Sequence, residues 1–137
     1  MSRSYDLLVS ERQVDGKRVA LMGASRGAIV ASIAGAIEGR FAAVVMAFGG
    51  HFDALETSHL PAACPANYIG RIAPRPLLMI NGVDDSDMIR DRSVEPLFKL
   101  ARQPKQIIWT PGGHGFMTEE HRAALIQWLR EKTGTSR

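Results

Sequence analysis

The chain has 137 residues, which is enough for one domain with a hydrophobic core of its own. Apolar residues make up 45% of it and charged residues 23%, a composition that excludes disordered and fibrous chains. Seventeen basic and 14 acidic residues give a net charge of +3, but the basic residues are scattered from Arg3 to Arg137. Because no stripe of positive charge follows from this pattern, we expect no nucleic-acid partner.

Cysteine content and hydropathy restrict the protein class further. The single cysteine, Cys64, excludes an internal disulfide and a cysteine-based zinc site. No apolar run approaches the ~20 residues that span a bilayer, so we expect no membrane partner. The N-terminal residues lack the apolar core of a signal peptide, and the expected location is therefore cytoplasmic.

Hydrophobic patterning predicts alternating helices and strands. In chain order these are a helix over residues 5–11, a strand over 18–22, a helix over 26–38, a strand over 42–48, a short turn over 67–72, a strand over 77–81, a helix over 93–101, a strand over 106–110 and a helix over 118–132. Ser93 and Thr118 are the expected N-caps of the last two helices, and Gly134 is the expected end of the last. The strands are almost continuously apolar, as in a parallel sheet covered on both faces. The predicted fold is therefore α/β, a single domain over residues 1–137 built from right-handed βαβ units.

The residues between the first strand and the next helix form a motif. Residues 23–27 read GASRG, a G-x-S-x-G sequence in a strand–turn–helix context. Such a turn lifts the Ser25 hydroxyl above the sheet in a strained conformation, and its two glycines are expected to avoid clashes between strand and helix. It also directs the Arg26 backbone N–H toward the site as a donor to an oxyanion.

A nucleotide-binding interpretation of the same segment is weaker. Residues 19–27 resemble the start of short-chain dehydrogenases, but Ile29 stands where their third glycine would fall. Their Tyr-x-x-x-Lys motif is also absent, since Tyr5 and Tyr68 are the only tyrosines and position 72 is Ile. No cofactor and no metal site is expected.

Two later strands end in residues that could activate a serine. Asp84 and Asp85 follow the third strand, and His114 follows the fourth within the sequence PGGHG. Carboxyl ends of parallel strands share one edge of the sheet, where open α/β sheets build their sites. A serine needs a base to take its proton, and that base needs an acid to orient it. The order Ser, Asp, His thus predicts a nucleophile, an acid and a base.

The chain resembles α/β-hydrolases of the dienelactone-hydrolase and acetyl-xylan-esterase-like type. The resemblance is carried by these motifs together with residues 14–19, the PRPLLMING run at 74–82 and the segment from Pro104 to Gly115. The resemblance covers nearly the whole chain from Tyr5 onward. It implies the catalytic set Ser25, Asp85 and His114, because the family acid usually lies three residues after the glycine at 82. Asp84 remains the alternative acid.

The resemblance also implies a fold that is only half present, with about four of some eight strands, as in a truncated or minimal hydrolase. The family's second oxyanion donor comes from a loop ahead of the nucleophile elbow, which is the turn over residues 23–27 that carries Ser25. That loop has no counterpart in the 24 residues before Ser25. The elbow strand, normally central, would have an open outer edge. We therefore expect a homo-oligomer, most simply a two-fold dimer that covers residues 18–22 or the exposed sheet face.

The function expected from the sequence is hydrolysis of small carboxylic esters through a Ser25–His114–Asp85 triad and an acyl-enzyme. Two alternatives stay open: a non-catalytic hydrolase remnant acting as an assembly or binding module, and a fragment of a prolyl-oligopeptidase-like peptidase. The other histidines have weaker claims. His51 could border the substrate, although a surface position is favoured, and His59 and His121 are expected to be exposed. The irregular segment 49–76 is expected to line the pocket or merely to connect two strands.

Overall fold

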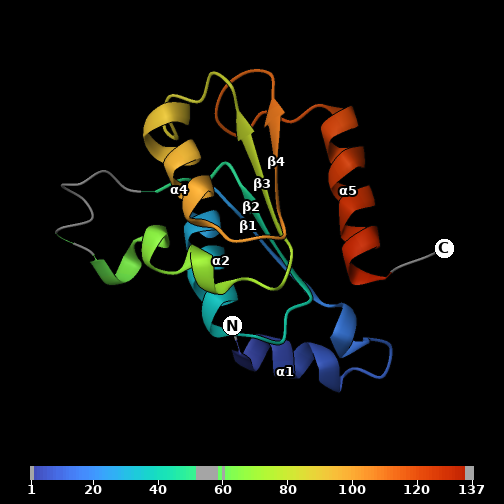
Figure 1. The fold of residues 1–137 in the computed structure, drawn as a ribbon. Helices are drawn as coiled ribbons and strands as arrows, with labels where there is room; N and C mark the ends of the chain where they lie inside the picture. Colours follow the sequence, from blue (N-terminus) through green and yellow to red (C-terminus); the bar gives the residue numbers. More distant parts are fainter. Residues whose placement is uncertain (1, 52–58, 60, 135–137) are drawn as a thin grey trace.

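A computed structural model describes residues 2–51, 59 and 61–134, which form a parallel four-stranded sheet with helices on both faces (Figure 1). Spatial order follows chain order, β1-β2-β3-β4. The strands are β1 (Ala20–Ala24), β2 (Ala43–Ala47), β3 (Leu77–Gly82) and β4 (Lys105–Thr110). The helices are α1 (Ser2–Ser10), α2 (Arg26–Ile37), α4 (Glu95–Leu100) and α5 (Glu119–Thr133), with short 3-10 turns at Gly16–Arg18, Pro61–Ala63, Pro65–Asn67 and Ile69–Arg71.

The two central strands explain why the sequence is so apolar there. Every residue of β2 and β3 is buried, because α2 and α4 cover one face of the sheet and α5 covers the other (Figure 1). Successive side chains point to opposite faces. Val44 and Met46 therefore join the core beneath α2 and α4, whereas Val45 and Ala47 join the core that holds Trp128 of α5. The α/β fold and its four parallel strands are as predicted.

The first strand departs from the prediction. It spans Ala20–Ala24 rather than 18–22, and of its five residues only Leu21 is buried. Burial was expected on both faces, yet Met22 is 46% exposed, because β1 lies at the edge of the described sheet and α5 packs over its neighbours. The side facing β2 is paired: the Val19 carbonyl accepts a hydrogen bond from Ala42 N at 2.8 Å. Strand alternation then turns the backbone groups of Ala20, Met22 and Ala24 toward the open edge.

The helix before β4 also begins differently from the prediction. α4 starts at Glu95, and a π-helical turn, Arg90–Val94, precedes it. Ser93 lies inside that turn and is not an N-cap; its hydroxyl instead donates to the His51 carbonyl at 2.7 Å. The last helix is bounded as expected, since the Thr118 side chain accepts a hydrogen bond from the backbone of α5 and Gly134 ends it with a φ of 67°.

Charged side chains tie the amino-terminal helix and the PRP run to the end of α2. Arg40 donates to Glu38 at 2.7 Å and to Asp6 of α1 at 2.6 Å, and its hydrogen bonds lower the pKa of Glu38 from 4.5 to about 2. Arg75 donates to the carbonyls of Gly35 at 2.6 Å and Glu38 at 3.0 Å, which satisfies the carbonyl end of the helix. Burial lowers the pKa of Arg75. These contacts fix the amino-terminal side of the sheet, opposite the edge where the predicted site residues lie.

Within the part of the chain described above, no helix has both the length and the apolar character that crossing a bilayer requires.

Candidate active site

Ser25 occupies the sharp turn between β1 and α2. Its backbone has φ 53° and ψ −121°, a region that non-glycine residues rarely adopt, and its N–H donates to the Ala47 carbonyl at 2.9 Å. Strain of this kind persists only where the surrounding structure enforces it. Here the enforcing elements are the pairing with β2 on one side and the start of α2 on the other. They raise the Ser25 hydroxyl over the carboxyl edge of the sheet.

The two glycines of the motif are not equivalent. A Cβ on Gly23 would lie 1.9 Å from the Gly27 carbonyl oxygen, so the helix can start this close to the strand only because Gly23 has no side chain. A Cβ on Gly27 would meet no atom within 4 Å. The expectation that both glycines relieve a clash is therefore correct for Gly23 and wrong for Gly27, which faces open space.

Asp85 is held in the loop after β3 with both carboxylate oxygens engaged. The side chain is fully buried, and Oδ1 accepts hydrogen bonds from the backbone N–H groups of Asp87 and Met88, each at 2.9 Å. This leaves Oδ2 to face His114. The neighbouring Asp84 is exposed and has no such contact. Of the two acids that the sequence left open, the structure brings Asp85 to the histidine.

His114 joins the other two residues. Its Nδ1 lies 2.8 Å from Asp85 Oδ2, and its Nε2 lies 2.9 Å from Ser25 Oγ. With the Nδ1 proton donated to the carboxylate, Nε2 is left unprotonated and accepts the serine hydroxyl. The glycine-rich loop allows this placement, since Gly112 takes a φ of 86°. The three residues predicted from sequence thus form one continuous hydrogen-bonded chain, which we refer to as the triad.

Phe48 is a residue of the site that the sequence analysis did not single out. It directly follows β2, has a φ of 53°, and packs its ring against that of His114 in an edge-on arrangement with centroids 5.9 Å apart. A bulky residue with positive φ is a genuine outlier. Its N–H donates to the Ile80 carbonyl at 2.6 Å, so pairing with β3 holds the strain in place. The only signal in the sequence was its position between a strand and Gly49.

The first turn of α2 supplies backbone donors beside the hydroxyl. The leading N–H groups of a helix have no carbonyl within the helix to bond. Ala28 N donates to the Ser25 carbonyl at 2.9 Å, whereas the N–H groups of Arg26 and Gly27 have no hydrogen-bond partner among the described residues. The predicted oxyanion donor, Arg26, is therefore free to bond a ligand. The partial positive charge at the amino end of the helix favours an anion at this place.

The remaining histidines and the cysteine lie outside the triad. His51 is half-buried, and its Nδ1 lies 3.9 Å from Sγ of the buried Cys64, so it is not the surface residue that was favoured. His59 is exposed, as expected. His121, expected to be exposed, is instead half-buried and contacts the Thr118 hydroxyl. Residues 52–58 and 60, which belong to the segment predicted to line the pocket, fall outside the described residues.

One group of described side chains has a spacing that a metal ion could use. Ligand atoms of Asp85, Asp87 and His114 lie within 4.8 Å of one another. Both oxygens of Asp85 already accept hydrogen bonds from protein groups, and the His114 nitrogen nearest to them is one of the donors. The donor set therefore fits an acid–base pair better than a metal centre.

Solved structures with the same arrangement of elements include α/β hydrolases and esterases. The α/β hydrolase GrgF from a Penicillium species superposes with a TM-score of 0.80 at 14% identity, over 97% of this chain and 70% of its own. Acetyl xylan esterase 1 from a Thermoanaerobacterium species superposes with a TM-score of 0.75 at 20% identity, over 95% of this chain and 50% of its own. Glucuronoyl esterase from Solibacter usitatus superposes with a TM-score of 0.69 at 19% identity, over 96% of this chain and 46% of its own.

The fold is that of the α/β hydrolases. The chain spans about half the length of the acetyl xylan esterase and the glucuronoyl esterase, and 70% of GrgF, so it presents this fold in a short form. No protein-family model matches the sequence, and comparison with curated proteins gives no match. The likeness to the α/β-hydrolase fold therefore rests on architecture, at identities of 14–20% for these three structures.

Proposed function

We propose that the protein is a serine hydrolase that cleaves small carboxylic esters through an acyl-enzyme. The observation that carries the proposal is the hydrogen-bonded chain from Ser25 through His114 to Asp85, with contacts of 2.9 and 2.8 Å. Nucleophile, base and orienting acid in hydrogen-bond reach of one another are the geometric signature of nucleophilic acyl transfer. The α/β-hydrolase fold of the chain supports the same reaction class.

In the proposed acylation step, Ser25 Oγ attacks the ester carbonyl carbon while His114 Nε2 takes the hydroxyl proton. Asp85 keeps the Nδ1 proton in place and stabilises the imidazolium that forms. His114 then gives its proton to the departing alkoxide oxygen as the C–O bond breaks. Water attacks the resulting acyl-serine in the same manner, releasing the carboxylic acid and restoring the free serine.

The negative charge that develops on the carbonyl oxygen needs hydrogen-bond donors. The N–H groups of Arg26 and Gly27 have no hydrogen-bond partner in the described part of the chain and follow the nucleophile directly in sequence. We assign Arg26 as the first donor, as expected from the elbow geometry. Each well-placed donor of this kind contributes roughly a 10²–10³-fold increase in rate, so a site with one donor would turn over slowly.

Ester substrates are favoured over peptides on two grounds. Two of the structures with the same fold are named as esterases, one for acetyl xylan and one for glucuronoyl groups. An alkoxide also leaves more readily than an amine and therefore demands less of an oxyanion site to which we assign a single donor. The alternative is a prolyl-oligopeptidase-like activity on peptides. Hydrolysis of a peptide nitroanilide is measured beside that of the ester, and a preference for the nitroanilide would replace the esterase assignment with a peptidase.

We expect Ser25→Ala to abolish hydrolysis of short-chain nitrophenyl esters. Loss of the nucleophile in a complete triad costs roughly 10⁴–10⁶ in kcat, because the remaining groups act only on a nucleophile that is present. The measurement is the steady-state release of nitrophenol by the two proteins at equal concentration. Equal rates would show that the hydrolysis does not pass through Ser25 and would refute the proposal.

A second function stays open: a non-catalytic module that uses the hydrolase fold for assembly. The oxyanion site is the observation behind it, since the donors that we identify there, the N–H groups of Arg26 and Gly27, belong to a single helix turn. The intact triad counts against it. A protein without catalysis has no need of a buried Asp85 whose Oδ1 accepts two backbone hydrogen bonds and whose Oδ2 contacts His114. A fluorophosphonate probe separates the two functions, because it labels only an activated serine.

We also propose that a second copy of the chain pairs with the open edge of β1. An antiparallel pair with Met22 on the two-fold axis would place Ala20 of each copy opposite Ala24 of the other. This uses the outward-facing backbone groups and covers the exposed Met22 side chain.

Sedimentation velocity at micromolar concentration tests this pairing. Met22→Lys is expected to shift the protein to monomer, because a lysine at the axis meets its symmetry mate. Ile126→Lys on α5 is a matched control, since Ile126 is 49% exposed against 46% for Met22 and lies on another element. A wild-type monomer, or equal weakening by both substitutions, would contradict the proposed interface.

A further inference from the structure

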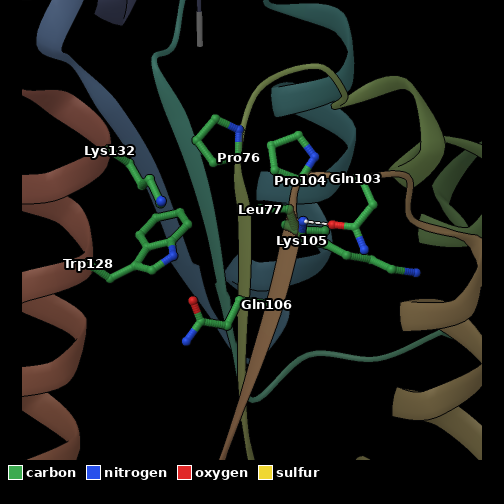
Figure 2. Close-up of a pocket in the computed structure, with 8 residues that line it drawn as sticks. All are labelled: Pro76, Leu77, Gln103, Pro104, Lys105, Gln106, Trp128 and Lys132. Carbon is green, nitrogen blue, oxygen red and sulfur yellow. Dashed lines mark hydrogen bonds between the residues drawn. The ribbon is translucent and has the colours of Figure 1, made fainter.

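A hollow in the protein surface lies at the opposite end of the sheet from the triad. It is a cavity of about 100 Å³ between the amino ends of β3 and β4 and the last turns of α5. Pro76, Leu77 and Pro104 form its apolar wall, and Trp128 and Lys132 close it from the helix (Figure 2). Nothing in the proposed hydrolysis uses this cavity.

Trp128 brings a hydrogen-bond donor to it. The residue is 5% exposed, and its indole N–H has no hydrogen-bond partner among the described residues. Among the described residues, Asn81 Oδ1 is the one side-chain nitrogen or oxygen that is both inaccessible to solvent and without a hydrogen-bond partner. The indole N–H, which also has no partner, is therefore accessible to solvent. Figure 2 shows the indole nitrogen turned toward the cavity. Buried tryptophans usually find a partner for this group, and here the place for it is empty space.

The side chains that line the cavity carry a net positive charge, because they include two lysines and no acid. Lys132 follows Trp128 by four residues and so lies on the same face of α5, with its ammonium beside the indole ring in Figure 2 and no ion pair among the described residues. Lys105, by contrast, is already used, since its ammonium donates to the Phe98 and Ala101 carbonyls at 2.7 Å each. None of the lining residues is acidic. The nearby Glu131 lines the adjoining hollow and accepts a hydrogen bond from Gln127 at 3.0 Å.

The two amides of the wall can add hydrogen-bond donors. Gln103 Oε1 accepts the Lys105 backbone N–H at 3.0 Å, which leaves the Gln103 NH₂ group free (Figure 2). Gln106 lies on the other side of the Trp128 ring from Lys132, with its amide oxygen nearer to the ring in Figure 2, and its NH₂ group faces the ring once the amide is turned over. A ligand that suits this wall has oxygen acceptors, one negative charge and a short apolar part. Phosphate fits less well, because two charges would meet a single ammonium, and its oxygens would leave the proline wall uncovered.

We propose that this cavity binds a short-chain carboxylate, with its oxygens on the Trp128 N–H and Lys132 and its alkyl group against the two prolines. A volume of about 100 Å³ corresponds to roughly three water molecules and so admits an acid of a few carbons. The same chemistry occurs in the terminal carboxylate of a peptide. The site is independent of the proposed esterase function and stands whether or not Ser25 is catalytic.

The test is a titration with sodium propionate followed by the indole N–H signals in ¹H–¹⁵N spectra. The chain has two tryptophans, so Trp128→Phe identifies the signal of interest by its disappearance. We expect a saturable shift of the Trp128 signal and a smaller or absent shift of the other. N-acetylalanine in place of propionate asks whether a peptide terminus enters as well; a saturable shift there assigns the peptide as a second source.

Two controls make the result decisive. Propionamide has the shape of propionate without the charge and is expected to produce no saturable shift. Lys132→Gln should weaken propionate binding about tenfold, whereas Lys99→Gln, the same charge change at an exposed residue of α4, should leave it unchanged. The proposal is overturned if propionate gives no saturable shift, if propionamide acts equally well, or if the two lysine variants behave alike.

Discussion

Asp85→Asn is expected to lower kcat for ester hydrolysis by about 10⁴-fold while leaving the fold intact. Asparagine keeps the size of the side chain, and its oxygen can still accept the backbone N–H groups of Asp87 and Met88. Its NH₂ group would then face His114 Nδ1 and favour the tautomer in which Nε2 carries the proton. That histidine cannot take a proton from Ser25, and the same substitution in a serine-protease triad has an effect of this size.

Asp84→Asn is the matched control for this prediction. Asp84 is the adjacent residue, carries the same charge and is exposed, without a contact to His114. We expect its kcat to stay within about threefold of wild type, since an exposed charge has little effect on its surroundings. Steady-state kinetics on a nitrophenyl ester gives both values. A large loss in Asp84→Asn with none in Asp85→Asn would mean that the acid loop is shifted by one residue in the working enzyme.

The second large effect is expected at the elbow glycine. Gly23→Ala places a methyl carbon where the Gly27 carbonyl oxygen now lies, at a separation of 1.9 Å. Strand and helix must move apart, because neither contact atom belongs to a flexible side chain. We expect the free energy of unfolding to fall by about 3 kcal/mol or more, which is the upper end for overpacking, and activity to be lost with the displaced Ser25.

Gly27→Ala is the control that shows whether the motif tolerates an added methyl group at a position without a close contact. The added methyl group meets no atom within 4 Å, and alanine is the better residue inside a helix. We expect unchanged activity and a gain of roughly 0.5–1 kcal/mol in the free energy of unfolding. Urea denaturation of the two variants gives the comparison. Equal destabilisation by both would show that the close approach at Gly23 does not set the geometry of the turn.

The sequence was most informative where burial and chain order act together. β2 and β3 are continuously apolar and lie in the middle of the sheet, so their bounds were predicted to within a residue or two. Ser25, Asp85 and His114 were predicted as site residues because each follows the carboxyl end of a strand, and parallel strands bring those ends to one edge. Their hydrogen-bonded contact is consistent with the expected acid–base chemistry.

Other features depended on tertiary contacts that leave no mark in a local pattern. Ser93 looks like an N-cap, but its hydroxyl bonds the His51 carbonyl, and a π-helical turn replaces the expected start of the helix. Met22 reads as a core residue, yet whether it is buried depends on what lies beyond β1. Phe48 could not be placed against His114 without knowing that its backbone takes a positive φ.

Labelling of the intact protein with a fluorophosphonate, followed by measurement of its mass, tests whether Ser25 is an activated nucleophile. The reaction forms a phosphorus–oxygen bond to Ser25 Oγ and releases fluoride, and it requires His114 to take the hydroxyl proton. We expect a single adduct on Ser25 that is absent in Ser25→Ala and in His114→Ala. An unlabelled wild-type protein, or an adduct that persists in Ser25→Ala, would contradict it.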